Sequence, residues 1–457
     1  MTSTTRDLTQ GKPLKIILLF SLPIMFGNIF QQCYALTDSI VLGRGVGADA
    51  LAALGAADWI NWLVLWAVTG LAQGFSVLAA EHFGAKDYAG LKNCTAMIIC
   101  LYAACSLFLT AVSQLAAYPL LLLLRTDPQI LADSLLYLRI QFGGIPIILA
   151  YNIAAALLRC AGNSRAPFVA ILIASVLNIG LDIVFVMDFG WGIAGAAAAT
   201  VIAQAFSFLY CLLVIARIPV FHIGRLDWKL NFPVLRRLCY LGLPAAAQGS
   251  IIALGGMVFQ SVVNSFGLSF VAGCTAANKV NGILESTATA LDHAMTAYMG
   301  QNHGACQAKR IDQGIRAGVL LAAGLALFLS GCMLIFGEHI LSLFISAQEV
   351  NRTDVLRVAL QYLQVMSCSL IALFLLHIYR AALTGLGRVV PSTVSGGIEL
   401  VMRVGVSLTL PHLIGVYGVF FAEVSAWIAA AVQIILSYYF CVPRIKRRML
   451  QPLHVSS

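Results

Sequence analysis

The 457-residue sequence carries little charge for its length. Lys, Arg, Asp and Glu make up only 10% of the residues, whereas hydrophobic residues make up 60%. Soluble globular domains carry about 25% charged residues. The longest polar stretches, 218–233 and 337–353, are too short to fold alone. The composition therefore excludes a sizeable soluble domain.

Three sequence patterns are also missing. There is no G-x-x-x-x-G-K-[ST] phosphate loop, so ATP hydrolysis is not expected and any transport would use an ion gradient or run downhill. The 12 cysteines form no C-x-x-C pair, which indicates small buried side chains rather than zinc or disulfide sites. The first apolar run is long, so we expect it to be a membrane span rather than a cleavable signal peptide.

What the chain has instead is a series of twelve apolar segments. Each is long enough to cross a bilayer as a helix, which takes about 20 mostly apolar residues. We expect these spans at 14–42, 51–82, 92–118, 129–159, 166–187, 192–217, 234–265, 270–302, 314–336, 354–386, 390–410 and 415–442. The sequence therefore predicts an all-α polytopic membrane protein with twelve transmembrane helices.

The second six segments repeat the first six. Matching residues, at offsets of 221, 220, 225 and 225, are Leu22-Pro23 with Leu243-Pro244, Gly84 with Gly304, Tyr137-Leu138 with Tyr362-Leu363, and Gly162 with Gly387. Because each copy has six helices, both copies start on the same side of the membrane, as a parallel duplication does. We expect an N-terminal six-helix lobe at 1–217, a cytoplasmic connector at 218–233, and a C-terminal six-helix lobe with a basic tail at 234–457.

The net charge of +9 is a sign of membrane topology. Of the 28 Lys and Arg, three lie inside predicted spans and four lie on one side, which leaves 28 − 3 − 4 = 21 on the other. Cytoplasmic loops collect Lys and Arg, so we expect both termini in the cytoplasm of a multi-pass inner-membrane protein. This sorting excludes a nucleic-acid partner and makes the lipid bilayer the expected surroundings.

Two carboxylates lie inside the predicted spans of the first half. An ionisable side chain there is costly and is a functional candidate. Asp38 lies near the outer end of the first span and Asp182 in the outer half of the fifth. Thr200 lies about 12 Å below the outer end of the sixth span, at 1.5 Å per residue. These three residues share a depth.

Other polar residues share faces with these three. Helical spacing aligns Gln31 and Tyr34 with Asp38, Asn178 with Asp182, and Ala196 with Thr200, and Tyr137 enters the fourth span at similar depth. Two carboxylates, an amide and a hydroxyl at one level can replace the water shell of a cation. The carboxylates can instead share a proton, because close like charges raise one pKa. Two structural alternatives stay open: pairing of Asp38 with Arg44, and a hydrogen-bonding role for Asp182.

The charges inside the second half allow several interpretations. Glu399 and Arg403 lie four residues apart on one helix, which favours mutual neutralisation. Other charged side chains within spans either line a water-filled cavity or form cross-helix pairs. They are Lys279, Glu285, Asp292 and Glu423.

Five stretches resemble the multidrug and toxic compound extrusion (MATE) family, closest to its bacterial DinF-like branch. They are TDSIVLGRGVGADALAALGAA at 37–57, RCAGNSRAP at 159–167, NIGLDIVFV at 178–186, GWGIAGAAAAT at 190–200 and GQNHGA at 300–305. The resemblance implies two pseudo-symmetric six-helix lobes around a central cleft. It also implies an antiporter that exports small amphipathic or cationic organic compounds in exchange for Na⁺ or H⁺.

The resemblance also implies a cation-coupling site in the first lobe. The family residues match Asp38, Asn178, Asp182, Ala196 and Thr200, of which all but Ala196 would hold Na⁺ if the protein is sodium-coupled. Tyr137 is similar to a family tyrosine near this network. One departure is Asn163, which replaces a family aspartate in a cytoplasmic turn.

We expect no cofactor beyond the coupling ion, no catalysis, and a monomer that binds a small organic substrate. Candidate substrate contacts are Gln31, Tyr34, Tyr137, Asn152, Lys279 and Glu285. Two alternatives are a lipid-linked oligosaccharide flippase of the same superfamily and a membrane-embedded enzyme. A flippase would favour a strongly basic cavity, and an enzyme needs a catalytic cluster that the eight dispersed His do not form.

Overall fold

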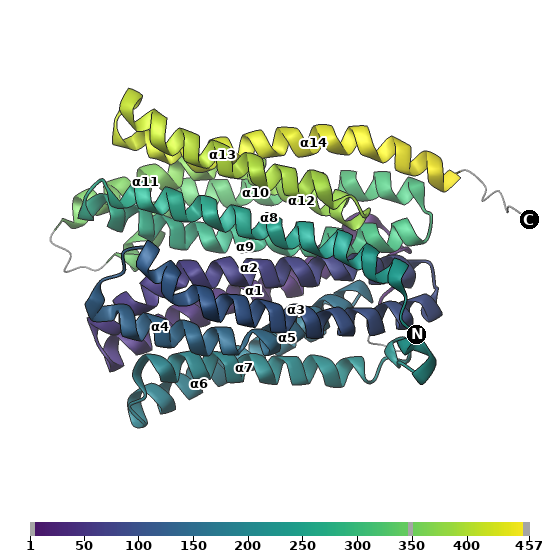
Figure 1. Ribbon diagram of the computed structural model, residues 1–457. Coiled ribbons are helices and arrows are strands. Elements are labelled where there is room, and N and C mark those ends of the chain that lie inside the picture. The colour runs from purple at the N-terminus through teal and green to yellow at the C-terminus, as the bar shows by residue number, and fades with distance from the viewer. Residues whose placement is uncertain (1–4, 346–350, 451–457) are drawn as a thin grey trace, which may run out of the picture. The chain divides into compact units, whose positions relative to one another are not determined.

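The computed structural model describes residues 5–345 and 351–450, and every regular element in these ranges is a helix (Figure 1). The predicted all-α class is confirmed. The chain divides into two compact units, called unit 1 (Met1–Gln10 with Leu22–Ser250) and unit 2 (Gly11–Ser21 with Ile251–Ser457). One boundary precedes α1 (Pro13–Gly45), and the other two fall inside α1 and α8 (Phe232–Asn264), so both helices are shared between units.

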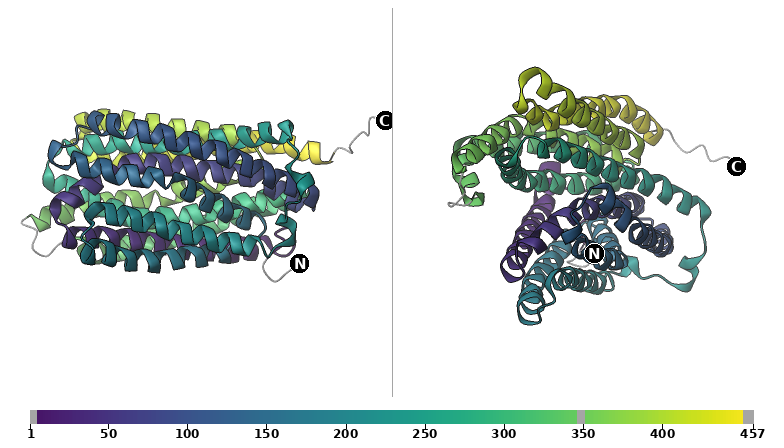
Figure 2. Two further views of the ribbon diagram at one scale, coloured as in Figure 1. Left: turned by 60° about the horizontal axis from the view of Figure 1, so that its bottom comes forward. Right: turned by 60° about the vertical axis from the view of Figure 1, so that its left-hand side comes forward.

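Each unit is a set of helices that run alongside one another (Figures 1 and 2). The further elements of unit 1 are α2 (Ala48–Gly84), α3 (Tyr88–Leu123), α4 (Pro128–Gly143), α5 (Ile145–Cys160), α6 (Arg165–Asp182), the π-helix η1 (Ile183–Asp188), α7 (Gly192–Ile215), and the 3-10 helices η2 (Pro219–Phe221) and η3 (Arg225–Trp228). Those of unit 2 are α9 (Leu268–Gly304), α10 (Ala308–Phe344), α11 (Arg352–Cys368), α12 (Leu370–Gly385), α13 (Val389–Ile414), the 3-10 helix η4 (Val416–Phe420) and α14 (Phe421–Leu450).

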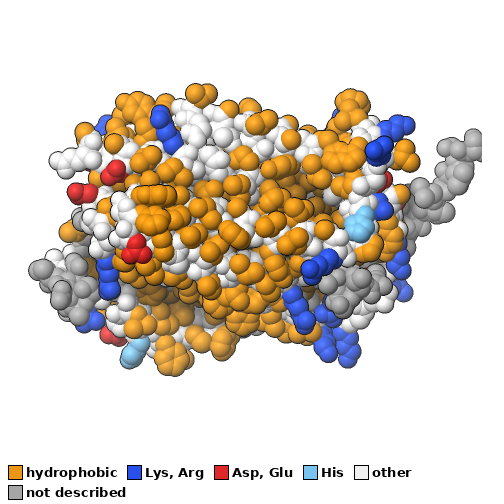
Figure 3. All heavy atoms as spheres, turned by 90° about the horizontal axis from the view of Figure 1, so that it is seen from below, with side chains coloured by type: hydrophobic (Ala, Val, Ile, Leu, Met, Phe, Trp, Pro, Cys, Tyr) orange, Lys and Arg blue, Asp and Glu red, His pale blue; other side chains and the backbone are white. Residues whose placement is uncertain are grey.

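The apolar segments of the sequence are the helices of the structure. Within the described ranges, 9 helices are long and apolar enough to span a membrane, and the number rises to 11 if each of two bent helix pairs is one span. The twelfth expected span is α9, which has 37 residues but does not meet the same composition criterion. On the face that includes α6 and α7, hydrophobic side chains form a continuous band with the charged side chains toward its two ends (Figure 3). Such a surface suits a lipid environment.

The fourth and tenth predicted spans are not single helices. α4 and α5 meet at 47°, and α11 and α12 meet at 48°. In the first pair Pro146 follows the break at Gly144 and cannot donate a helix hydrogen bond. In the second pair the hydroxyl of Ser369 donates to the carbonyl of Val365 at 3.1 Å and competes with the backbone ladder. The breaks at Gly144 and Ser369 are 369 − 144 = 225 residues apart, which matches the repeat.

The backbone repeats as well as the sequence. Residues with positive φ, a conformation that favours glycine, recur at the repeat offsets of 220 and 225. The pairs are Gly47 with Gly267, Lys86 with Cys306, Gly162 with Gly387, and Gly190 with Gly415. At Gly162 no other residue would fit, because a Cβ atom would lie 1.9 Å from the carbonyl oxygen of Arg6. The lobe limits 1–217 and 234–457 around the connector 218–233 stay a prediction, because the units divide within α1 and α8.

Candidate functional site

The buried carboxylates of unit 1 lie on α1 and at the end of α6. Asp38 is 7% exposed, Asp182 is 0% exposed, and Asn178, one turn before Asp182, is 1% exposed. Four of their oxygen atoms are buried and accept no hydrogen bond from a described residue: Oδ1 of Asp38, Oδ1 of Asn178, and both carboxylate oxygens of Asp182. Buried acceptors of this kind are nearly always satisfied in folded proteins. Their concentration here marks the region as a functional candidate.

The hydroxyl of Thr200 joins α7 to this group. The amide of Asn178 donates to Oγ1 of Thr200 at 3.4 Å, and Oγ1 donates to the carbonyl oxygen of Ala196 at 3.1 Å. The NH₂ of the Asn178 amide is therefore bonded to α7, while its buried oxygen accepts no hydrogen bond from a described residue. Ala196 is fully buried, and its small side chain allows α6 and α7 to approach.

α1 packs along α6, as the shared depth of Asp38 and Asp182 requires. A Cβ atom on Gly27 would lie 3.2 Å from Cδ1 of Ile171, and the rings of Phe30 and Phe168 are 6.4 Å apart. Asp38 is close enough to Asp182 to interact with it electrostatically. The three helices that carry the predicted site residues are therefore neighbours.

Tyr34 connects α1 to α7. Its hydroxyl makes hydrogen bonds with Gln31 on its own helix and with Gln204 on α7, and it interacts with Asp38. Gln204 was not predicted, although it lies one turn after Thr200 on the same face of an apolar helix. That spacing was a usable signal.

Asp58 of α2 and the π-helix η1 also lie near the site and were not predicted from the sequence. Tyr137 is buried, receives a hydrogen bond from Gln141 at 3.4 Å, and interacts electrostatically with Asp38 and with Asp58 of α2. Asp58 lies inside the second predicted span, so the sequence did mark it as a charge in the membrane. The π-helix η1 begins directly after Asp182, and such segments are frequent at functional sites.

The remaining predicted residues of unit 1 have ordinary surroundings. Asn152 donates to the carbonyl of Ile148 at 2.8 Å within its own helix. Oδ1 of Asn163 accepts from the N–H of Ala166 at 2.9 Å, so this side chain supports the turn before α6. Within the described ranges Asp38 makes no ion pair with Arg44, which is exposed.

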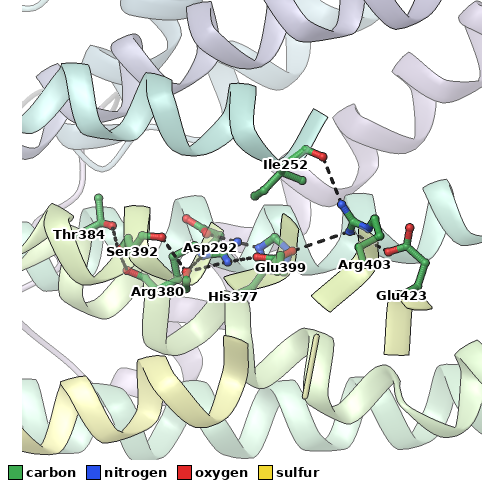
Figure 4. Close-up of polar contacts among 10 residues, drawn as sticks. Ile252, Asp292, His377, Arg380, Thr384, Ser392, Glu399, Arg403 and Glu423 are labelled. Atoms are coloured by element: carbon green, nitrogen blue, oxygen red, sulfur yellow. Dashed lines mark hydrogen bonds and ion pairs between the residues drawn. The ribbon is translucent and has the colours of Figure 1, made fainter. Parts of the chain in front are cut away.

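Unit 2 also has carboxylates inside its helices, and those of Glu399 and Glu423 form ion pairs with arginines of the same unit (Figure 4). Glu399 forms an ion pair with Arg380, and the carboxylate of Glu423 lies 2.7 Å from Arg403. The predicted pairing of Glu399 with Arg403 is correct only as a secondary contact, at 3.9 Å. It was incomplete because the closer partners come from other helices, which the spacing along α13 cannot reveal.

Arg380 corrects the charge count. Arg380 is one of the 21 basic residues that the sequence pattern assigns to the cytoplasmic side, but it is 6% exposed and also donates to Oγ of Ser395 at 2.9 Å. Its positive charge therefore balances the negative charge of Glu399 and does not indicate which side of the membrane the residue faces. Lys279 is exposed on α9, and Glu285 is half-buried on the same helix.

The described residues contain no group of three or more His, Cys, Asp or Glu side chains that could hold a metal ion. A cation site in unit 1 would therefore combine the carboxylates of Asp38 and Asp182 with neutral oxygens. Asn178 and Thr200 supply such oxygens. Carboxylate, amide and hydroxyl oxygens are hard ligands, which suit an alkali cation better than a transition metal.

The comparisons with known proteins identify the family. The MatE family profile matches residues 23–184 and 244–409, so one profile fits both halves of the chain. The matches begin 244 − 23 = 221 residues apart and end 409 − 184 = 225 residues apart, which confirms the internal repeat.

Individual relatives agree with the profile. The chain is 33% identical to the probable multidrug resistance protein YpnP of Bacillus subtilis over 74% of this chain and 76% of that protein. It is 27% identical to DNA damage-inducible protein F of Escherichia coli over 74% of each. The fold matches a crystal structure of MATE in complex with MaL6, with a TM-score of 0.90, 23% identity, and coverage of 98% of this chain and 100% of that one. The chain is therefore a multi-pass membrane protein of the MatE family.

Proposed function

We propose that this protein is a secondary active antiporter that exports small amphipathic or cationic organic compounds in exchange for Na⁺ or H⁺. The observation that carries the proposal is the group of buried, unsatisfied oxygens on Asp38, Asn178 and Asp182. The family match supports transport rather than catalysis, since YpnP is named a probable multidrug resistance protein.

The unsatisfied oxygens explain why an ion is needed. An ionised carboxylate that leaves water pays several kcal/mol unless a counter-charge accompanies it. Two carboxylates that interact electrostatically cannot both stay charged without a cation or a proton. Na⁺ would be held by Asp38, Asn178, Asp182 and Thr200, whereas H⁺ would sit on one of the carboxylates.

The same negative charge links the ion to the cargo. A cationic compound that approaches Tyr34 and Tyr137 meets the field of Asp38, and both tyrosines already interact with that carboxylate. A bound Na⁺ or H⁺ cancels this field, so the driving ion and the cargo compete. Competition of this kind makes binding of the driving ion release the cargo. Gln31, Asn152, Lys279 and Glu285 stay our further candidates for substrate contact.

The experiment is ethidium efflux from proteoliposomes under an imposed Na⁺ gradient or an imposed pH gradient. We expect one gradient to drive efflux and Asp182→Asn to abolish that response. The matched control is Asp188→Asn, which removes an exposed carboxylate six residues later. Efflux by Asp182→Asn at the wild-type rate would exclude this site as the coupling site. Absence of efflux from the wild type under both gradients would refute the proposed activity for cationic dyes.

We also propose that a single chain is sufficient, with both termini and the connector 218–233 in the cytoplasm of the inner membrane. Lys229 lies in this connector, where its carbonyl accepts a hydrogen bond from Asn93 at 3.0 Å. A cysteine at Lys229 should resist a membrane-impermeant maleimide added to intact cells, whereas a cysteine at Arg352 should react. Labelling at Lys229 but not at Arg352 would invert the orientation.

A further inference from the structure

The helix α14 of unit 2 is longer than its counterpart in the repeat, which is α7 of unit 1. α7 ends at Ile215, and the repeat offset of 225 maps this position onto Phe440 (215 + 225 = 440). α14 continues to Leu450, which is 450 − 440 = 10 residues, or about three turns, beyond that point (Figure 1). We call residues 441–450 the α14 extension. Unit 1 has no matching part of α7, so the repeated fold does not explain the extension.

One face of α14 packs onto unit 2 at the extension. Tyr438, Val442 and Ile445 recur at helical spacing, and each is at most 5% exposed. Beside this face, the ammonium group of Lys446 forms an ion pair with Asp312 of α10. The extension is therefore a fixed part of the fold, and these contacts determine which of its side chains point outward.

The outward face of the extension is basic. Arg444, Arg447 and Arg448 are exposed, and no ion pair among the described residues includes them. The guanidinium of Arg444 lies over the ring of Phe440, 3.9 Å from the ring centroid. Spacings of three and four residues place these side chains together on one helix face. We call Phe440, Arg444, Arg447 and Arg448 the basic face.

The basic face lies at the depth where a bilayer changes from acyl chains to headgroups. Phe440 follows the first residue of α14, Phe421, by 440 − 421 = 19 residues, or about 28 Å at 1.5 Å per residue. The hydrocarbon core of a bilayer is about 30 Å thick. Tyr439 and Phe440 are 63% and 64% exposed, as is common for aromatic side chains at a membrane interface. The three arginines follow within the next two turns, at the level of the lipid phosphates.

We propose that the basic face binds the headgroup of an anionic phospholipid. Guanidinium groups donate paired hydrogen bonds to phosphate oxygens, and basic segments next to a membrane span attract anionic lipids. The choline group of a zwitterionic lipid, in contrast, brings a positive charge that the arginines repel. The exposed rings of Tyr439 and Phe440 offer apolar surface to the acyl chains, which favours a lipid over a free phosphate. The site is independent of the proposed transport activity and of the orientation in the membrane.

The experiment measures how lipids stabilise the purified full-length protein in detergent. Dioleoylphosphatidylglycerol is the anionic lipid and dioleoylphosphatidylcholine, with the same acyl chains, is the zwitterionic one. The test variant combines Arg444→Gln, Arg447→Gln and Arg448→Gln. Because basic residues at a helix C-terminus also stabilise the helix itself, the quantity compared is the rise in melting temperature above the lipid-free value.

We expect the anionic lipid to stabilise the wild type at a lower concentration than the zwitterionic lipid does. The triple variant should need about tenfold more of the anionic lipid, since each arginine contributes to the attraction. Equal responses of the wild type to both lipids would refute the proposal. A triple variant that responds to the anionic lipid as the wild type does would also refute it.

The matched control removes the same number of charges elsewhere. Arg225→Gln, Lys229→Gln and Arg236→Gln are combined, and all three residues are exposed in the connector or at the start of α8. This control should keep the wild-type preference for the anionic lipid. If it loses as much preference as the test variant, the net charge of the protein is responsible and the basic face is not a site.

Phe440→Leu keeps the test decisive if the triple variant does not fold. It preserves every charge and removes only the ring that positions Arg444, so the anionic lipid needed for half-maximal stabilisation should rise about threefold. An unchanged lipid requirement would overturn the assignment of a defined site. The soluble compound sn-glycerol 3-phosphate tests the other source of phosphate, and it should not stabilise the wild type. Stabilisation by this compound that matches the effect of the anionic lipid would assign the site to free phosphate and overturn the proposal.

Discussion

The buried carboxylates of the candidate site in unit 1 differ from those of Glu399 and Glu423 in unit 2 in their partners. Among the described residues of unit 1, Asp38 and Asp182 form no ion pair, whereas in unit 2 Glu399 and Glu423 pair with one arginine each. At the repeat offset of 225, Arg403 occupies the position of Asn178 (403 − 178 = 225). A guanidinium that is part of the chain thus replaces a neutral amide. Unit 2 thus carries a fixed cation at this position of the repeat, and we propose that unit 1 holds an exchangeable one.

The largest expected effect, and the strongest test of this comparison, is the loss of transport when a carboxylate of unit 1 is substituted. Asp38→Asn and Asp182→Asn should each lower gradient-driven ethidium efflux at least tenfold, because the exchangeable cation loses its counter-charge. The melting temperature should not fall, since each change removes a buried charge that has no partner. Purified variants are compared in proteoliposomes and by thermal unfolding. Parallel loss of folding and transport would mean that these carboxylates are structural.

The next effect is destabilisation of unit 2. Glu399→Gln leaves Arg380 buried without its closest partner, and breaking a buried pair costs about 3–5 kcal/mol. We expect a lower melting temperature and lower yield, whereas Glu338→Gln on the exposed face of α10 should change neither. A Glu399 variant that melts with the wild type but fails in efflux would assign this carboxylate to ion coupling and erase the contrast between units.

Much of this contrast was visible in the sequence, and the part that was not has a physical reason. The apolar helices, the repeat and the proximity of Asp38 to Asp182 follow from apolar length and helical spacing, which are local properties. The pairing of Arg380 with Glu399 joins different helices, so it depends on how α12 packs against α13.

The bends within the fourth and tenth predicted spans, and the partners that side chains find on other helices, could not be predicted from the sequence pattern either. Apolar length does not distinguish a straight span from α4 and α5, which meet at 47°. Gln204 was missed although its spacing from Thr200 placed it on the same face. Its hydrogen bond with Tyr34 requires α1 and α7 to be neighbours, which only the packing decides.

A smaller effect concerns the helix that both units share. The boundary in α1 lies between Ser21 and Leu22, next to Pro23, which is inside the helix and cannot donate to the carbonyl four residues earlier. Pro23→Ala restores this hydrogen bond and should stiffen α1 where it passes between units. We expect efflux to fall several-fold at unchanged expression, measured in the same proteoliposome assay. Wild-type efflux by this variant would remove the proline from the transport cycle.

The smallest expected effect concerns an exposed carboxylate–imidazole pair, Asp87 with His82, which serves as a comparison for the buried pairs of unit 2. Asp87, in the turn before α3, accepts from the N–H of Gly90 at 2.9 Å and contacts His82 at 2.9 Å. The Gly90 hydrogen bond is the main cause that lowers the pKa of Asp87 below its ordinary value, and His82 adds to it. A depressed pKa means that the stabilisation is present above the unfolded-state pKa of about 3.9 and is lost as pH falls through the folded-state value.

Asp87→Ala removes this helix cap and should lower the free energy of unfolding by about 1 kcal/mol at pH 7. The difference from the wild type should shrink below about pH 4, where the carboxylate becomes protonated in the wild type as well. Thermal unfolding at pH 7 and at pH 3.5 measures it, with the exposed Asp133→Ala in the interior of α4 as control. Because water screens the exposed pair, this loss should be several-fold smaller than that of Glu399→Gln. Burial distinguishes the paired carboxylates of unit 2 from surface pairs. Equal losses in the free energy of unfolding would show that burial is not the reason why the unit 2 pairs stabilise the fold.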